Sequence, residues 1–236
     1  MLISVIALMM VHASIYDKTK SSNIYTSAQE LVDNSVYDEN TTYSKFYTSA
    51  ALAYCDKTGH LSNPEDCCSA SSWLNYIGFT EMYLGRIHTK AGEKATYTIS
   101  SNAYNTETRP YHHFLISFGL DKTKGRDPDK IEKALTNYKM VDYELYDVIE
   151  GTKIVRYFDR LYKEVRGQLF EDLESMMPYR KKNYDITFIG HSLGGALAEL
   201  AAFEFKKLYP HHKADLVTFG SPRVGNFKFS SMLALK

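Results

Sequence analysis

Apolar and polar positions alternate along the chain with two different spacings, which separate the expected helices from the expected strands. The clearest helical pattern runs from Val155 to Met177, where apolar residues recur at steps of three and four, and Pro178 is expected to end that helix. Short apolar or alternating runs bounded by polar residues predict strands. On these criteria we expect helices over 28–34, 43–54, 155–177 and 194–208, and strands over 95–100, 114–118, 186–189 and 216–219.

The succession of strand, helix and strand between 186 and 219 is typical of a βαβ unit. Such a unit has parallel strands and a right-handed crossover. The pattern therefore predicts an α/β fold with a mostly parallel sheet flanked by helices. The sequence contains no internal repeat and no low-complexity linker, which favours a single domain.

The composition is that of a globular protein and narrows the choice of partners. Hydrophobic residues make up 44% of the 236 residues, enough for a sizeable core. Lys plus Arg and Asp plus Glu number 28 each, so no net charge attracts nucleic acid or an anionic membrane surface. We expect no nucleic-acid partner, and the sequence does not indicate the oligomeric state.

The first thirteen residues form a separate segment. Leu2 to Met10 is apolar throughout but too short to span a bilayer as a helix, and Val11-His12-Ala13 follows with the small residues that signal peptidase prefers. We predict a signal peptide over 1–13, no transmembrane segment there, a domain over 14–236, and a secreted, extracellular or lumenal location. No basic residue precedes the apolar run, so a frayed or buried N-terminal segment is the alternative.

The three cysteines, Cys55, Cys67 and Cys68, lack the paired spacing of a zinc site. In a secreted chain they predict a disulfide between Cys55 and either of the other two, with one thiol left over. We expect no metal and no cofactor.

A candidate nucleophile lies between the strand at 186–189 and the following helix, in the motif Gly190-x-Ser192-x-Gly194. A tight turn from strand to helix needs glycines at its flanks and holds the serine hydroxyl outward. The backbone N–H of Leu193, at the helix N-terminus, would then hydrogen-bond a developing oxyanion. The alternative for Ser192 is a simple helix N-cap.

Two longer segments around this motif resemble the fungal-type class 3 lipases. They are GHSLGGALA at 190–198 and VTFGSPRVGN at 217–226, and AALAYC at 50–55 is similar to the N-terminal helix of that family. The resemblance covers roughly 43–226. It implies an α/β-hydrolase fold and hydrolysis of carboxylic esters, typically acylglycerols at a lipid–water interface.

The chain departs from that family at the second half of the oxyanion hole. Where the family has Arg-Gly followed by Thr or Ser, this sequence has Gly119-Leu120-Asp121. A backbone N–H does not depend on the side chain, so Leu120 is the candidate for the second oxyanion donor. The charge of Asp121 would oppose an oxyanion beside it.

The Asp and His that complete the family's triad lie farther along than this sequence extends, so we expect a C-terminally incomplete domain that is inactive or impaired. His60 and His88 lie in loops that the sequence does not place, and seven other histidines and aspartates are expected at the opposite edge of the sheet from Ser192 or in a different direction. They are His112, His113, His191, His211, His212, Asp185 and Asp215.

Three further alternatives remain. The polar segment 126–135 is either a lid over the site or a solvated surface helix. The domain itself is either a hydrolase or a non-catalytic lipase-like module that binds lipid or protein. An acyltransferase or a phospholipase would use the same fold and nucleophile.

Overall fold

The computed structural model describes residues 46, 48–54, 59–60, 74, 76, 79, 81–88, 94–106, 109–121, 139–144, 150–177 and 184–234. The signal peptide, the helix at 28–34, the three cysteines and the segment 126–135 lie outside these residues and stay predictions.

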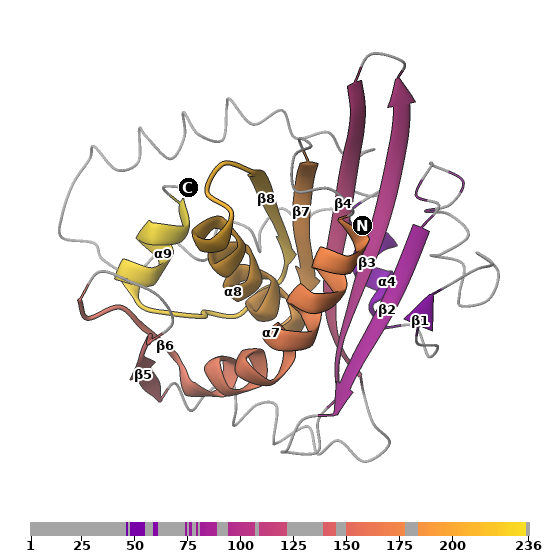
Figure 1. Cartoon of the computed structure of the whole chain (residues 1–236). Helices are drawn as coiled ribbons and strands as arrows, with labels where there is room; N and C mark the ends of the chain where they lie inside the picture. Colours follow the sequence, from indigo (N-terminus) through magenta and orange to yellow (C-terminus); the bar gives the residue numbers. More distant parts are fainter. Residues whose placement is uncertain are drawn as a thin grey trace, which may run out of the picture.

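The centre of the described fold is a six-stranded sheet with the order β1-β2-β3-β4-β7-β8 (Figure 1). Strands β4, β7 and β8 run parallel, whereas β1 to β4 pair antiparallel. The α/β prediction is confirmed, with the parallel pairing located at the strands that flank the serine motif. The sheet strands are β1 (Gly59–His60), β2 (Glu81–His88), β3 (Lys94–Thr106), β4 (Arg109–Asp121), β7 (Tyr184–His191) and β8 (Lys213–Phe219).

Helices cover both faces of this sheet. α7 (Arg156–Met176) and α8 (Leu193–Leu208) lie on one face, and α4 (Thr48–Leu52) lies on the other (Figure 1). Strand residues alternate between the two cores: Phe188 packs in the core under α7 and α8, and Ile189 in the core under α4. Each large apolar side chain buried in this way contributes about 1.5–3 kcal/mol.

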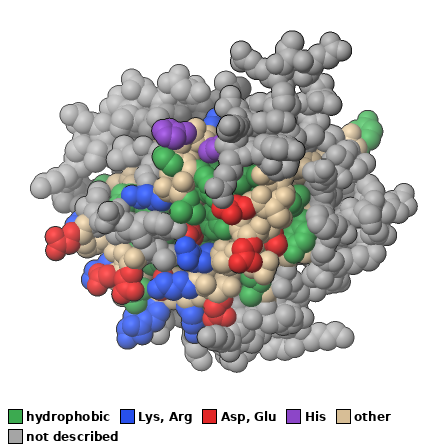
Figure 2. Space-filling view, in the orientation of Figure 1, with side chains coloured by type: hydrophobic (Ala, Val, Ile, Leu, Met, Phe, Trp, Pro, Cys, Tyr) green, Lys and Arg blue, Asp and Glu red, His purple; other side chains and the backbone are tan. Residues whose placement is uncertain are grey.

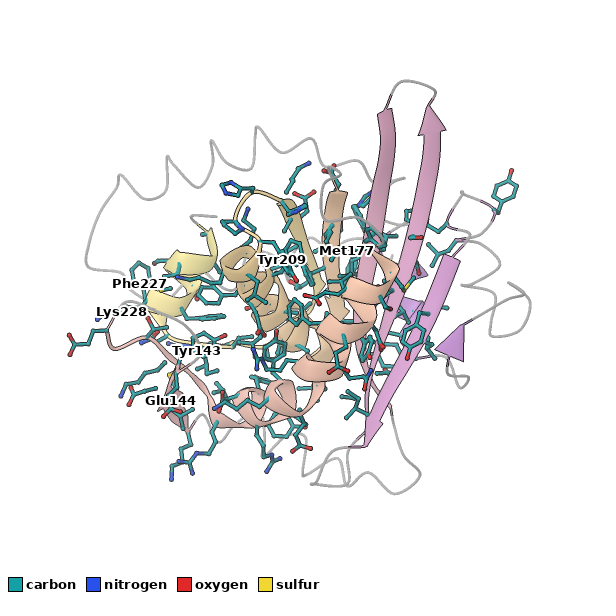
Figure 3. The ribbon with its side chains drawn as sticks, viewed as in Figure 1. Tyr143, Glu144, Met177, Tyr209, Phe227 and Lys228 are labelled. Carbon is teal, nitrogen blue, oxygen red and sulfur yellow. The ribbon has the colours of Figure 1, made fainter. Side chains whose placement is uncertain are left out.

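The C-terminal helix α9 (Phe227–Ala234) docks beside a small separate sheet of β5 (Met140–Asp142) and β6 (Lys153–Val155). Tyr143, labelled in Figure 3, lies between the ring of Phe203 from α8 and that of Phe229 from α9, at centroid distances of 5.6 and 6.0 Å. The Lys228 Nζ donates a hydrogen bond of 2.5 Å to the carbonyl O of Glu150. The ring contacts hold α9 against α8, and the Lys228 bond ties α9 to the segment before β6.

Charged side chains of both signs are interspersed on the face that Figure 2 shows. The i,i+4 pair of Lys163 and Asp159 on α7, with 2.9 Å between Nζ and Oδ2, is one example. This mixing agrees with the balanced composition of the chain.

The structure corrects several predicted boundaries. The helix expected over 43–54 ends at Leu52, and residues 53–54 form a turn. His112 and His113 were expected ahead of a strand, but they lie inside β4, because its pairing with β3 continues through polar positions.

Strand β2 was not predicted at all. Gly85 interrupts its alternation because the ring of Tyr97, on β3, occupies the space that a Cβ at residue 85 would need.

Candidate active site

Among the described residues other than glycine, only Ser192 has a positive φ. Its φ is 53° and its ψ is −125°, at the turn between β7 and α8. Such a conformation is strained for a residue with a Cβ, and it is the geometry that a nucleophile elbow requires. The side chain makes no capping hydrogen bond to α8, so the N-cap alternative gains no support from the contacts.

The glycines around Ser192 lie where side chains do not fit. A Cβ on Gly194 would overlap the carbonyl O of Phe118 and would lie 2.7 Å from the carbonyl carbon of that residue. A Cβ on Gly190 would overlap the backbone of Gly194 in the same way. The first turn of α8 therefore packs backbone to backbone against the C-terminal end of β4.

Backbone hydrogen bonds fix the turn itself. The Ser192 N–H donates to the carbonyl O of Phe219 at 2.9 Å, which ties the turn to the end of β8. The Gly195 N–H donates to the carbonyl O of Ser192, also at 2.9 Å. Leu193 begins α8, and the first N–H groups of a helix have no partner within it. The helix dipole adds positive potential at this end.

Leu120 lies two residues beyond the last parallel pair of β4 and β7, which joins Phe118 to Gly190. Its register partner on β3 is Ala95, and that of Asp121 is Lys94. Because Gly194 contacts the backbone at Phe118, the end of β4 that carries Leu120 adjoins the N-terminus of α8. The two predicted oxyanion donors, Leu193 and Leu120, are thus carried by adjoining segments.

His191 precedes the serine, and its imidazole is directed to Tyr54 in the turn that follows α4. The Tyr54 hydroxyl lies 3.2 Å from His191 Nδ1 and donates to the His191 carbonyl O at 3.3 Å. Sequence reasoning missed this contact, because the two residues are 137 positions apart. The side chain of His191 is exposed.

The other histidines and aspartates considered as triad candidates, namely His112, His113, His211, His212, Asp185 and Asp215, lie toward the far edge of the sheet, as expected. His113 Nε2 lies 2.9 Å from Thr187 Oγ1, and Lys213 Nζ lies 3.4 Å from Asp215 Oδ2 at the beginning of β8. Asp185 is the register partner of His113 and lies near the beginning of β7. His211 and His212 are in the turn before β8. Ser192 follows the C-terminal end of β7, so these groups are separated from it by the length of the strands.

A carboxylate in the second turn of α8 has a partner that was not predicted. Glu199, on α8, accepts a hydrogen bond of 2.6 Å from the Ser221 hydroxyl in the segment that follows β8. Burial raises the pKa of Glu199 to about 7, and the hydrogen bond from Ser221 opposes that rise. A Glu inside an alanine-rich helix gives no local signal that its partner lies 22 residues away.

Neither a metal-ligand cluster nor a membrane-spanning helix occurs in the described part of the chain. No group of three or more His, Cys, Asp or Glu side chains there is arranged to hold a metal ion. None of the helices in that part has the length and apolar character that crossing a bilayer needs.

Residues 124–236 match the protein family described as Lipase (class 3). A lipase of Caenorhabditis elegans is 44% identical over 82 residues, which are 34% of this chain and 23% of that protein. A secreted mono- and diacylglycerol lipase of Malassezia restricta is 34% identical over 84 residues, 35% of this chain and 27% of that protein. The matched stretches thus span about a quarter of these curated relatives.

A lipase of Rhizopus niveus is similar over a longer stretch, at 25% identity across 80% of this chain and 43% of that protein. A solved structure from a family of fungal lipases, 20% identical, superposes on 84% of this chain and 67% of its own with a TM-score of 0.55. This structural likeness shows a shared fold.

Proposed function

We propose that this chain, whose residues 124–236 match the Lipase (class 3) family, hydrolyses carboxylic esters of lipids, with acylglycerols as substrates. Relatives named as mono- and diacylglycerol lipases support this substrate class. Several of them are named as secreted, which supports an extracellular or lumenal location after removal of residues 1–13.

In the proposed reaction, the Ser192 Oγ attacks the ester carbonyl carbon. The N–H groups of Leu193 and Leu120 stabilise the resulting oxyanion, the alcohol leaves, and water then releases the fatty acid from the acyl-serine. The strained conformation of Ser192, with φ at 53° between β7 and α8, is the observation that carries this proposal.

A serine hydroxyl needs a histidine to accept its proton and a carboxylate to orient that histidine. Among the described residues, His191 is directed to Tyr54, and His113 and His212 lie toward the far edge of the sheet. We therefore propose that both groups come from outside the described residues.

One departure from the family favours a second candidate, a non-catalytic module that binds lipid or protein. Asp121 follows the proposed donor Leu120 directly, and an anionic side chain close to the oxyanion would disfavour it.

Hydrolysis of p-nitrophenyl butyrate separates the two candidates. The enzyme proposal expects turnover that falls to the uncatalysed rate in Ser192→Ala and is unchanged in Ser175→Ala, whose hydroxyl only bonds the Asp172 carbonyl on α7. A fluorophosphonate should label Ser192 in the same samples. If neither turnover nor labelling depends on Ser192, and the chain sediments with acylglycerol-containing vesicles, the binding module takes the place of the enzyme.

A further inference from the structure

We infer that Glu199 is a positioning residue for Ser192, which it holds in place through Ser221 and the end of β8. This inference rests on the proposed function in one respect only, the role of Ser192 as the nucleophile. The mechanical link between Glu199 and the turn at Ser192 does not depend on it.

The first step of the link is the hydrogen bond from Ser221 Oγ to Glu199 Oε1, at 2.6 Å. It joins the second turn of α8 to the segment that follows β8. Glu199 is half-buried, and a polar group withdrawn from water is costly to leave without its hydrogen-bond partner.

The second step is the contact between Ser221 and the first turn of α8. A Cβ on Gly195 would lie 2.8 Å from the Ser221 Cβ and 3.0 Å from its Oγ, so the two residues pack without a gap. Gly195 in turn bonds the Ser192 carbonyl O through its own N–H. A displacement of Ser221 is therefore transmitted to the turn that presents the nucleophile.

The third step is on the other side of the same turn. The Ser192 N–H donates to Phe219 O, two residues before Ser221. Gly220, between them, has a φ of 60° and lies at a bend in the chain. The nucleophile turn is thus bound at Phe219 and packed at Ser221, and Glu199 fixes the second of these positions.

The far end of the segment is fixed independently. The Val155 N–H donates to Val224 O at 2.8 Å, and the Asn226 N–H donates to Lys153 O at 2.9 Å. These bonds tie residues 224–226 to β6. Without the Glu199 bond, the part between Gly220 and Arg223 would lose a described link to α8.

Because Glu199 titrates, the link is expected to depend on pH. The charged groups of the neighbouring elements interact with residues other than Glu199. On α8 itself, Glu204 is bound by Arg166 and Tyr162 of α7. Lys213 of β8 lies near Asp185 of β7 and Asp215, and Arg223 Nε donates to Gly225 O. His113 of β4 bonds Thr187. The causes that set the pKa of Glu199 are burial and Ser221.

Amide hydrogen exchange tests the link without using activity. At pH 6 we expect the peptide covering 190–197 to exchange about tenfold faster in Glu199→Ala and Ser221→Ala than in the wild type, the scale of one lost hydrogen bond. The double variant should be no faster than either single variant. Glu199→Gln, which keeps an acceptor, should stay within about twofold of the wild type, and Ser175→Ala should not change.

Two results overturn the inference. One is an unchanged exchange rate at 190–197 in both alanine variants. The other is an equal acceleration in α7, since that would mean a general loss of stability and no specific link.

Kinetics then test the positioning role. If hydrolysis depends on Ser192, kcat should fall about tenfold in Ser221→Ala with KM unchanged, and a bend near pH 7 in the wild-type profile should be absent from Glu199→Gln. Equal changes in kcat and KM, or a bend that persists in Glu199→Gln, overturn that role. If no hydrolysis depends on Ser192, the proposed function fails, and the exchange rates still decide the link.

Discussion

Helices α7 and α8 cover the same face of the sheet and contact each other, but different kinds of contact hold them there (Figure 1). α7 buries one stripe of large side chains, among them Phe158, Tyr162 and Leu169, and exposes the opposite face. α8 is buried on nearly every side and begins with Leu193, Gly194, Gly195 and Ala196.

The two kinds of packing give the two helices different freedom to move. A helix held by large side chains tolerates small adjustments, because rotamers can shift and volumes can be exchanged. A helix whose backbone touches its neighbours has less freedom, because no side chain lies between them to adjust. The nucleophile is carried by the second kind of helix.

The largest expected effect on stability comes from replacing one glycine by alanine on each helix. Gly194→Ala should destabilise the fold by about 4 kcal/mol, because its Cβ overlaps the carbonyl of Phe118. Gly167→Ala on α7 meets no atom within 4 Å and should stabilise by about 0.5–1 kcal/mol. Urea denaturation of both variants measures the difference. Equal effects would show that the two helices are held alike.

The contact between the two helices comes next. Glu204 of α8 is fully buried and is bound by Arg166 and Tyr162 of α7. Glu204→Ala should cost about 3 kcal/mol, because it leaves a partly buried guanidinium without its counter-charge. Glu171→Ala, on the exposed side of α7, should stay within about 0.5 kcal/mol in the same thermal or urea unfolding experiment.

Glu199, on α8, is expected to make the free energy of unfolding depend on pH. Its pKa is raised from 4.5 to about 7 in the folded state, so the native protein binds the proton more tightly than the unfolded chain. The stability from this group is complete below pH 4.5 and is lost as the pH rises toward 7. Relative to wild type, Glu199→Gln should therefore gain about 1–3 kcal/mol between those limits. A wild-type pH dependence that survives in Glu199→Gln contradicts this assignment.

The smallest expected effect concerns the strain at the start of α8. Ser192→Gly should stabilise the fold by about 1 kcal/mol, because glycine adopts a φ of 53° without cost. Ser192→Ala keeps a Cβ in the same conformation and should show no such gain. Both variants lack the hydroxyl, so the melting temperature of Ser192→Gly should exceed that of Ser192→Ala.

Sequence patterns predicted the elements whose signal is local. The apolar stripe of α7 and the glycines around Ser192 each carry their information within a few residues. The contacts of Tyr54 with His191 and of Ser221 with Glu199 join residues that are distant in the sequence, and no periodicity encodes them. Strand β2 was missed for a related reason, since Gly85 breaks the pattern to admit a ring from the next strand.

The pairing of β4 with β7 has a consequence for how the molecule folds. β7, α8 and β8 are neighbours in the sequence, with Asp185 opposite Lys213, so this unit forms through short loops. The strand β4 that supports Gly194 pairs His112 with Tyr184 and closes a far longer loop, which makes its docking slower. Because the backbone of β4 packs against Gly194 beside the serine turn, we expect the nucleophile to be fully ordered only when β4 has docked.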